Sequence, residues 1–301
     1  MAINLKNLPE DEIFYGAKTC QGCGGLMACR MVMKVIGPKS CIAIPAGCMS
    51  ATTTVYPQSS LFVNNTVTAF PGLASTIAGM SVGGEVMGWD EDTTYVAFGG
   101  DGGTVDIGIQ ALSGAAERND NILYVCYDND AYMNTGNQKS GSTPEYAWST
   151  TTPTGPCSKG AKNKYRKSLI EIVAAHRVPY AATASIAFPM DLLRKVEKAT
   201  QYRGCRVLHI MSPCPTGWGY DPSKTVELAK LAVETGMWWL GEYENGEFRL
   251  TYKPKKLHES TEAYFKGQRR FRHLQPEDIA EIDRNRDNEW KRLKRVFNIN
   301  E

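Results

Sequence analysis

The chain has 301 residues, of which 42% are hydrophobic, and this length allows one large α/β domain or two smaller ones. Its formal net charge of +2 at pH 7 argues against a nucleic-acid-binding protein, which usually concentrates basic residues on one surface. No apolar run reaches the roughly 18 residues that a membrane span requires, and the N-terminal MAINLKNLPEDEIFYG lacks the basic-then-apolar pattern of a signal peptide. We therefore expect a cytoplasmic protein without a membrane partner.

Strand-like and helix-like segments alternate along the chain. Short apolar or β-branched runs predict strands, and longer segments of helical periodicity lie between them. The strands are expected at residues 41–45, 94–100, 122–128, 180–185 and 207–212, and the helices at residues 24–37, 73–87, 104–118, 166–176, 189–202 and 222–235. This alternation predicts an α/β fold, with a mostly parallel sheet covered by helices on both faces. Because the strands are continuously apolar, we expect them to be buried on both sides.

Two segments depart from this alternation. Residues 136–165 are rich in Gly, Ser, Thr and Pro, and a loop of that length in a compact domain is usually functional or covers a partner. From about residue 238 the chain becomes polar and charged, and it ends in the helical DIAEIDRNRDNEWKRLKRVF. We expect one domain over residues 1–237 and a C-terminal arm over residues 238–301 that contacts another subunit. A solvated surface helix is the alternative.

The glycine-rich sequence Gly99-Gly100-Asp101-Gly102-Gly103 stands between an expected strand and an expected helix. Glycines at such a turn let the backbone approach a phosphate closely, and the N-terminus of the following helix offers free N–H groups to an anion. Many α/β proteins carry turns of this kind. The carboxylate of Asp101 adds a hard oxygen ligand for Mg²⁺, which commonly bridges protein carboxylates and phosphates.

A second polar stretch, Asp128-Asn129-Asp130-Ala131, follows the next expected strand, and Asn129 stands 28 residues after Asp101. Two neighbouring parallel strands would place Asp101 and Asn129 side by side at their carboxyl ends, where open α/β sheets bind ligands. One carboxylate, an Asn oxygen and a backbone carbonyl, with two diphosphate oxygens and a water, would complete an octahedral Mg²⁺ site. An ordinary glycine turn next to an Asn-rich loop is the alternative interpretation.

The chain has nine cysteines, and because disulfides are disfavoured in the cytosol, clustered cysteines indicate metal binding or catalysis. The pair Cys20-x-x-Cys23 could hold Zn²⁺ or an iron–sulfur cluster, or act as a redox dithiol. Cys48 and Cys214 follow expected strands at the edge where the diphosphate site is expected, which favours them as further ligands. We interpret the remaining five as structural: Cys29, Cys41, Cys126, Cys157 and Cys205.

At these residues the sequence resembles a known family. GDG followed by an Asn about 28 residues later resembles the thiamine-diphosphate signature, and DNDAYMNTGNQ resembles its form in 2-oxoacid:ferredoxin oxidoreductases. The similarity extends through GDGGTVDIGIQALSGAAER, YVCYDNDAYMNTG, AHRVPYAATAS, RKVEKA, PCPTGW and RFRHLQPEDIAEI. The chain is similar to the β subunit of the multi-subunit pyruvate:ferredoxin oxidoreductase type. The resemblance implies a thiamine-diphosphate-binding fold, with the diphosphate-binding domain in residues 1–237.

The resemblance also implies roles for individual residues. Asp101, Asn129 and the carbonyl of Ala131 would bind Mg²⁺, and Asn134 would act next to the reactive thiazolium. Contacts to the cofactors would come from Gly47, Cys48, Gly100, Asp101, Gly102, Gly103, Asn129, Ala131 and Asn134. The [4Fe–4S] cluster of the family would be held by Cys20, Cys23, Cys48 and Cys214, which match its ligands in order and context. A structural zinc site is the alternative.

By the same resemblance, this chain is one part of a larger enzyme. Thiamine diphosphate acts as the electron sink for decarboxylation of a 2-oxoacid, and the nearby cluster accepts the electrons. The pyrimidine-binding domain belongs to an α subunit, and further ferredoxin-type clusters belong to γ and δ subunits that pass electrons to ferredoxin. Coenzyme A takes the acyl group in pyruvate-type members. We therefore expect the isolated chain to be inactive.

The substrate is open at this stage. Residues 45–54 read PAGCMSATTT, where pyruvate-type relatives generally show a Thr-Gly-Cys-Leu-Glu-like run. Pyruvate is the first expectation, oxalate without coenzyme A the second, and a bulkier 2-oxoacid such as phenylglyoxylate the third. A non-redox thiamine decarboxylase or synthase is a rival enzyme class. A small electron carrier or a zinc-stabilised assembly subunit, which would use only the cysteines, is the non-enzymatic rival.

Overall fold

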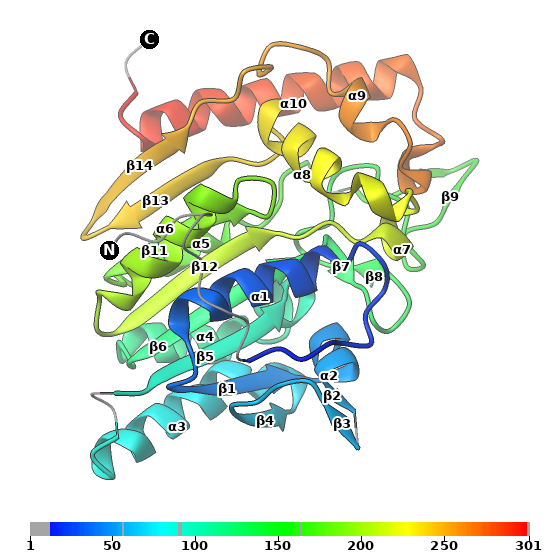
Figure 1. The fold of residues 1–301 in the computed structure, drawn as a ribbon. Helices are drawn as coiled ribbons and strands as arrows, with labels where there is room; N and C mark the ends of the chain where they lie inside the picture. The colour runs from blue at the N-terminus through cyan, green and yellow to red at the C-terminus, as the bar shows by residue number, and fades with distance from the viewer. Residues whose placement is uncertain (1–12, 56, 90–91, 163, 300–301) are drawn as a thin grey trace.

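The fold is taken from a computed structural model, which describes residues 13–55, 57–89, 92–162 and 164–299. Most of the N-terminal sequence MAINLKNLPEDEIFYG lies outside these residues. Eight strands form one sheet in the order β14-β13-β11-β12-β6-β5-β1-β4 (Figure 1). Their bounds are β1 Ser40–Pro45, β4 Asn64–Thr68, β5 Thr94–Gly100, β6 Ile122–Asp128, β11 Tyr180–Ser185, β12 Cys205–Met211, β13 Leu240–Glu244 and β14 Glu247–Tyr252.

The strands from β4 to β11 in this order run parallel, and β13 and β14 are added antiparallel at one edge. The expected mostly parallel α/β fold is therefore confirmed. All five predicted strands are present. Three have the expected bounds, and the end points of β1 and β12 differ from those expected by one or two residues. Among the described residues, none of the helices has both the length and the apolar character that a membrane span requires.

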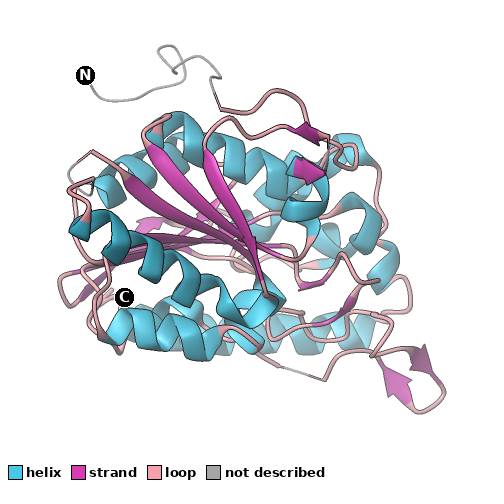
Figure 2. Ribbon diagram, turned by 90° about the horizontal axis from the view of Figure 1, so that it is seen from below, coloured by secondary structure: helices cyan, strands magenta, loops and turns pink. Residues whose placement is uncertain are grey.

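Helices cover both faces of the sheet (Figure 2). Helices α1 (Gly24–Ile36) and α6 (Pro189–Thr200) pack on one face, and α3 (Leu73–Val86), α4 (Ile109–Glu117) and α5 (Leu169–Ala174) pack on the other. Strand β6 is continuously apolar because its side chains enter the cores on both faces of the sheet. Leu123 and Val125 point into the first core, whereas Ile122 and Tyr124 point into the second, because successive side chains alternate across a sheet.

Several short elements were not predicted. The edge strand β4 has the polar sequence NNTVT, which carries no apolar signal. The long loop expected at residues 136–165 contains β8 (Gln138–Lys139) and the hairpin of β9 (Thr154–Gly155) with β10 (Ser158–Lys159). The other short strands are β2 (Thr54–Val55), β3 (Gln58–Ser59) and β7 (Ala131–Tyr132), and the other short helices are α2 (Cys48–Thr53), α7 (Pro215–Trp218) and α9 (Glu262–Phe265). Helix α8 (Thr225–Glu234) lies within the helix expected at residues 222–235, and α10 (Pro276–Val296) covers most of the expected C-terminal helical stretch.

The C-terminal segment is built into the fold. Strands β13 and β14 extend the main sheet, and α10 lies beside their hairpin (Figure 1). Trp290 and Leu293 of α10 are buried against the β14 residues Phe248 and Leu250, while Ile282 joins a separate core with Trp218. One face of α10 therefore packs on the core of this chain, and residues of its other face are exposed. The domain boundary at residue 237, a contact with another subunit and the alternative of a solvated surface helix stay predictions.

Candidate functional site

The two polar stretches of the expected phosphate site meet at one edge of the sheet. Strands β5 and β6 are parallel neighbours, and Gly100 at the end of β5 pairs with Tyr127 near the end of β6. Asp101 directly follows β5 and is fully buried. The backbone N–H of Asn129 donates a 3.3 Å hydrogen bond to Oδ1 of Asp101. The structure thus brings Asp101 and Asn129 together, as the strand order requires.

The side-chain amide of Asn129 faces two oxygen acceptors at this point, Oδ1 of Asp101 and the carbonyl of Ala131. The side-chain oxygen of Asn129 lies 2.9 Å from the carbonyl oxygen of Ala131 and 3.1 Å from Oδ1 of Asp101. Either a cation between the oxygens or an amide turned by 180°, which would donate to both acceptors, satisfies this arrangement. Neighbouring ligands of an octahedral Mg²⁺ with bonds of about 2.05 Å stand about 2.9 Å apart. The chemistry and the spacing of this donor set therefore fit Mg²⁺.

Electrostatics favour a cation at the same point. Burial raises the pKa of the Asp101 carboxyl, and the charges of Asp128 and Asp130 raise it further. Hydrogen bonds from the Ser140 hydroxyl and the Asn129 N–H act in the opposite direction but do not cancel this rise. A cation beside Asp101 would offset the cost of an ionised carboxylate in this buried position.

One cavity collects most of the residues expected to contact a cofactor. Its lining includes Gly47, Cys48, Gly100, Gly102, Gly103, Asn129, Ala131 and Asn134. Asp101 belongs to the same turn but is buried. The sequence did not indicate the aromatic lining residues Phe70, Tyr127 and Tyr132. Phe70 follows the unpredicted strand β4, so no preceding strand pointed to it.

The glycine turn allows two aromatic rings to approach the backbone. A Cβ at Gly102 would lie 2.7 Å from the Tyr132 ring, and one at Gly103 would lie 3.1 Å from the Phe70 ring. The two rings are stacked, with centroids 5.8 Å apart. A side chain at Gly102 would force Tyr132 to move. The missing side chains at Gly102 and Gly103 therefore leave room for the aromatic wall of the cavity.

The four cysteines selected from the sequence lie in one neighbourhood. Gly24, next to Cys23, donates a 3.2 Å backbone hydrogen bond to Pro213, next to Cys214. Burial raises the pKa of Cys48 to about 12, and the charges of Cys214, Cys23 and Cys20 contribute to this rise. Because Cys48 also lines the cofactor cavity, the thiols and the expected phosphate site adjoin each other.

The spacing of these thiols bears on the type of metal centre. Among the described residues, no three His, Cys, Asp or Glu side chains gather closely enough to hold one metal ion. A zinc site requires such convergence on one atom, whereas a four-iron cluster takes each cysteine at a different corner. Whether the four thiols hold a cluster or zinc therefore stays a prediction. Cys126 and Cys205 are buried within strands, as interpreted from the sequence.

A set of buried polar contacts around Asn129 was invisible in the sequence. Trp218 donates its indole N–H to the carbonyl of Asn129 at 2.8 Å. His209 Nε2 lies 2.7 Å from Oδ2 of Asp128. Asp130 forms buried ion pairs with Arg166 and Arg270. These partners come from distant parts of the chain, so no local spacing could reveal them.

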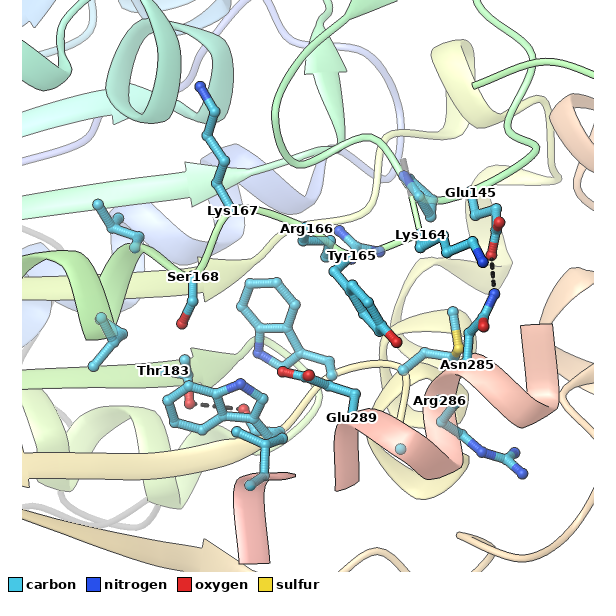
Figure 3. Close-up of a pocket in the computed structure, with 18 of the residues that line it drawn as sticks. Glu145, Lys164, Tyr165, Arg166, Lys167, Ser168, Thr183, Asn285, Arg286 and Glu289 are labelled. Carbon is cyan, nitrogen blue, oxygen red and sulfur yellow. Dashed lines mark hydrogen bonds between the residues drawn. The ribbon is translucent and has the colours of Figure 1, made fainter. Parts of the chain in front are cut away.

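A second cavity lies away from the glycine turn, between the segment before α5 and helix α10 (Figure 3). Tyr165 and Arg166 line one side, and Asn285 and Glu289 of α10 line the other. The two sides are joined by a 2.7 Å hydrogen bond from Asn285 to Glu145. None of the expected cofactor ligands lines this cavity, but Arg166 and His209 connect its wall to the loop after β6.

Comparisons with known proteins agree with this geometry. Residues 45–210 match the family model of the thiamine pyrophosphate enzyme C-terminal TPP-binding domain. The chain is 47% identical over 276 residues to pyruvate synthase subunit PorB of Methanothermobacter thermautotrophicus, which covers 91% of this chain and 95% of that protein. The chain belongs to the family of 2-oxoacid:ferredoxin oxidoreductase β subunits. The expected resemblance is thereby confirmed, and this family member is a subunit of an enzyme with a thiamine pyrophosphate-binding domain.

Further relatives lie within the same family. Ketoisovalerate oxidoreductase subunit VorB of Pyrococcus abyssi is 42% identical over 295 residues, which cover 96% of this chain and 94% of that protein. Among solved structures, the 2-oxoglutarate:ferredoxin oxidoreductase of Magnetococcus marinus with 2-oxoglutarate, coenzyme A and succinyl-CoA bound has a TM-score of 0.57 and 22% identity. The aligned part covers 75% of this chain and 82% of the chain in that structure. At this identity the likeness establishes the shared fold of the family.

Proposed function

We propose that the chain supplies the Mg²⁺–diphosphate half-site and a [4Fe–4S] cluster of a complex that oxidatively decarboxylates a small 2-oxoacid and reduces ferredoxin. Pyruvate, with coenzyme A, is the proposed substrate. The observation that carries the proposal is the adjacency of two sites. The Asn129 side-chain amide lies 2.9 Å from the carbonyl oxygen of Ala131 and 3.1 Å from Oδ1 of Asp101, and Cys48 lines the same cavity as Asn129 and Ala131.

In this proposal each group of residues has a distinct task. Asp101, Asn129 and the carbonyl of Ala131 hold Mg²⁺, and the glycine turn leaves its backbone N–H groups free for diphosphate oxygens. Cys20, Cys23, Cys48 and Cys214 hold the cluster. Thiamine diphosphate, when bound, supplies the electron sink for decarboxylation. Asn134 is exposed at the cavity, and its amide would orient the reacting part of the substrate.

The proposal requires partner subunits. The curated relatives are named as subunits, and the exposed lining residues Asn134 and Thr135 leave part of the cavity wall free for another chain. An α subunit with the pyrimidine-binding domain would cover this side of the cofactor. Subunits of γ and δ type with ferredoxin-type clusters would carry electrons to ferredoxin in the cytoplasm. The isolated β chain would then show no turnover.

A second substrate is favoured by the relatives. Three of them are named for ketoisovalerate at 41% to 42% identity, close to the 40% to 47% of those named for pyruvate synthase. The test is a panel of pyruvate, 2-oxoisovalerate, oxalate and phenylglyoxylate on the whole anaerobic complex, with and without coenzyme A, followed by viologen reduction. We expect coenzyme-A-dependent oxidation of pyruvate to be fastest. Fastest turnover of 2-oxoisovalerate, or oxidation of oxalate without coenzyme A, would replace pyruvate as the substrate.

Cofactor analysis tests the proposed centres themselves. The purified complex should be brown, and the β chain should account for about four iron and four sulfide. Asp101→Ala should abolish thiamine diphosphate retention and leave the absorbance of the cluster intact. Asp92→Ala, at an exposed carboxylate paired with Lys39, is the matched control and should retain the cofactor. A colourless zinc protein, or an Asp101→Ala variant with full cofactor content, would overturn the corresponding assignment. Decarboxylation without viologen reduction would indicate a non-redox thiamine enzyme.

A further inference from the structure

The loop that carries two of the proposed Mg²⁺ ligands has an unusual backbone at its centre. Asp130 stands between Asn129 and Ala131 and has a φ of 66°. Most residues other than glycine are disfavoured in this left-handed region, and aspartate tolerates it better than most. The position of the Ala131 carbonyl and of the Asn129 side chain depends on this conformation, so the contacts that hold Asp130 also fix the oxygens beside Asp101.

Asp130 is held at its backbone and at its side chain. Its N–H donates to Oδ1 of Asp128 at 2.8 Å, and its carbonyl accepts the hydroxyl of Thr143 at 2.6 Å. Its carboxylate, which is fully buried, pairs with Arg166 and, at 2.9 Å, with Arg270. The Arg270 side chain is only 3% exposed and that of Arg166 16%, so water cannot readily replace either partner.

The two arginines come from segments that are far apart in the sequence. Arg166 precedes α5, lines the cavity of Figure 3, and donates to the carbonyl of Ser142 at 2.9 Å. Arg270 lies in the 3-10 turn η4 (Arg269–Phe271) of the C-terminal segment. Its guanidinium lies 3.6 Å from the centroid of the Trp218 ring, and Trp218 in turn holds the carbonyl of Asn129. The C-terminal segment therefore contacts the loop in two ways. Arg270 forms an ion pair with Asp130, and it packs on the Trp218 ring that holds the Asn129 carbonyl.

The charges explain why two arginines are tolerated beside a cation site. The three carboxyl groups of Asp101, Asp128 and Asp130 lie beside the two guanidinium groups of Arg166 and Arg270. Both guanidinium groups form ion pairs with Asp130 rather than with Asp101. They therefore hold the loop after β6 in place and leave the Asp101 carboxylate for the proposed Mg²⁺.

We propose that Arg270 and Arg166 are positioning residues for the metal loop, by which we mean residues 129–131. Through Arg270, the C-terminal segment then sets the affinity of this loop for Mg²⁺ and diphosphate. This inference rests on the proposed function. Loss of either guanidinium leaves the buried Asp130 carboxylate short of a partner and releases the left-handed backbone. The oxygens of Asn129 and Ala131 then no longer meet Asp101 at the spacing that Mg²⁺ requires.

The test is cofactor binding to the whole complex, measured without turnover. Calorimetric titration with thiamine diphosphate at a series of Mg²⁺ concentrations gives the Mg²⁺ concentration for half-saturation. We expect Arg270→Gln to raise it at least tenfold. Arg270→Lys should recover part of the loss, because an ammonium keeps the charge but cannot form the planar fork of contacts. Arg272→Gln, at an exposed arginine of the same segment, is the matched control and should bind as the wild type does.

The outcomes separate the inference from the proposed function. A wild-type complex that binds no Mg²⁺ and thiamine diphosphate would overturn the proposed function and this inference with it. A wild type that binds, together with an Arg270→Gln variant that has the same half-saturation, would overturn the inference alone. If Arg270→Gln does not assemble, Arg270→Lys decides. An assembled Arg270→Lys complex that needs the same Mg²⁺ concentration for half-saturation as the wild type, with or without a lowered melting temperature, would show that the arginines only stabilise the fold.

Discussion

The indole N–H of Trp218 donates a 2.8 Å hydrogen bond to the backbone carbonyl of Asn129. Trp218 ends helix α7, and Cys214 caps the N-terminus of this helix, with its Sγ accepting the N–H of Gly217 at 3.4 Å. One short helix thus joins a proposed cluster ligand to a proposed Mg²⁺ ligand. A displacement of Cys214 is therefore expected to shift the Asn129 carbonyl in the metal loop through Trp218.

Trp218→Phe tests this link. The variant keeps most of the ring volume but leaves the Asn129 carbonyl without its donor, at a cost of about 1–3 kcal/mol for a buried acceptor. We expect weaker binding of thiamine diphosphate by about tenfold. Trp290→Phe is the matched control, because Trp290 makes an equivalent 2.8 Å bond to the carbonyl of Gly236 away from the site. Equal cofactor affinities in the two variants would contradict the link.

Single cysteine variants test the ligand set. Replacement of Cys20, Cys23, Cys48 or Cys214 by serine removes one corner ligand of the proposed cluster. We expect each variant, purified anaerobically, to lose most of its iron and the brown absorbance. Cys157→Ser is the control, because Cys157 is exposed on the β9–β10 hairpin and should keep a full iron content. Retention of the cluster in any of the four variants would remove that residue from the set.

The strand and helix pattern could be predicted because burial on both faces makes it visible. The buried strands β5 and β6 are nearly uninterrupted apolar runs, and the glycine turn and Asn129 lie at the ends of these strands. The edge strand β4 was missed because its sequence, NNTVT, is polar and partly exposed. The helix expected from residue 104 instead begins with the π-helical turn Gly102–Asp106, and regular helix starts only at Ile109. Hydrophobic periodicity does not distinguish these turns.

The contacts that support the site could not be predicted for a different reason. Arg270 stands 140 residues after Asp130, and Arg166 stands 36 residues after it, so their pairing depends on the completed fold. Both arginines also lie among other basic residues, in KNKYRK and GQRRFR, from which sequence alone selects no single member. The residues that bind a ligand directly follow a motif. The residues that orient them are specified by tertiary packing.

Lys195 is expected to be a stability residue of the sheet. Its side chain is 1% exposed and donates to Asp191 at 2.6 Å, to the carbonyl of Thr183 at 2.8 Å and to Thr251 at 2.9 Å. These bonds join α6 to β11 and β14. We expect Lys195→Met to lower the free energy of unfolding by about 2–4 kcal/mol, because the buried Thr183 carbonyl and the half-buried Asp191 carboxylate lose their donor. Urea unfolding of the purified subunit measures this, and Arg194→Met, at the exposed neighbour, should cost less than about 0.5 kcal/mol.

The pair of Arg292 and Glu171 is expected to make stability depend on pH. Arg292 of α10 donates to both carboxylate oxygens of Glu171 of α5, at 2.6 and 2.8 Å. These hydrogen bonds hold the pKa of Glu171 below its usual value. The carboxyl therefore contributes stability at pH values above the unfolded pKa of about 4.3, and this contribution is lost as the pH falls through the folded pKa.

Arg292→Ala should remove this contribution and flatten the acid side of the stability curve. Because both side chains are partly exposed, the expected loss is only about 0.5–1 kcal/mol at pH 7. The difference from the wild type should shrink toward zero at about pH 3, where Glu171 is protonated with or without its partner, and it should also shrink in high salt. Urea unfolding at a series of pH values measures the difference, with Lys291→Ala, at an exposed neighbour in α10, as the control. A difference that stays constant from pH 7 to pH 3 would show that Arg292 acts through packing and not through its charge.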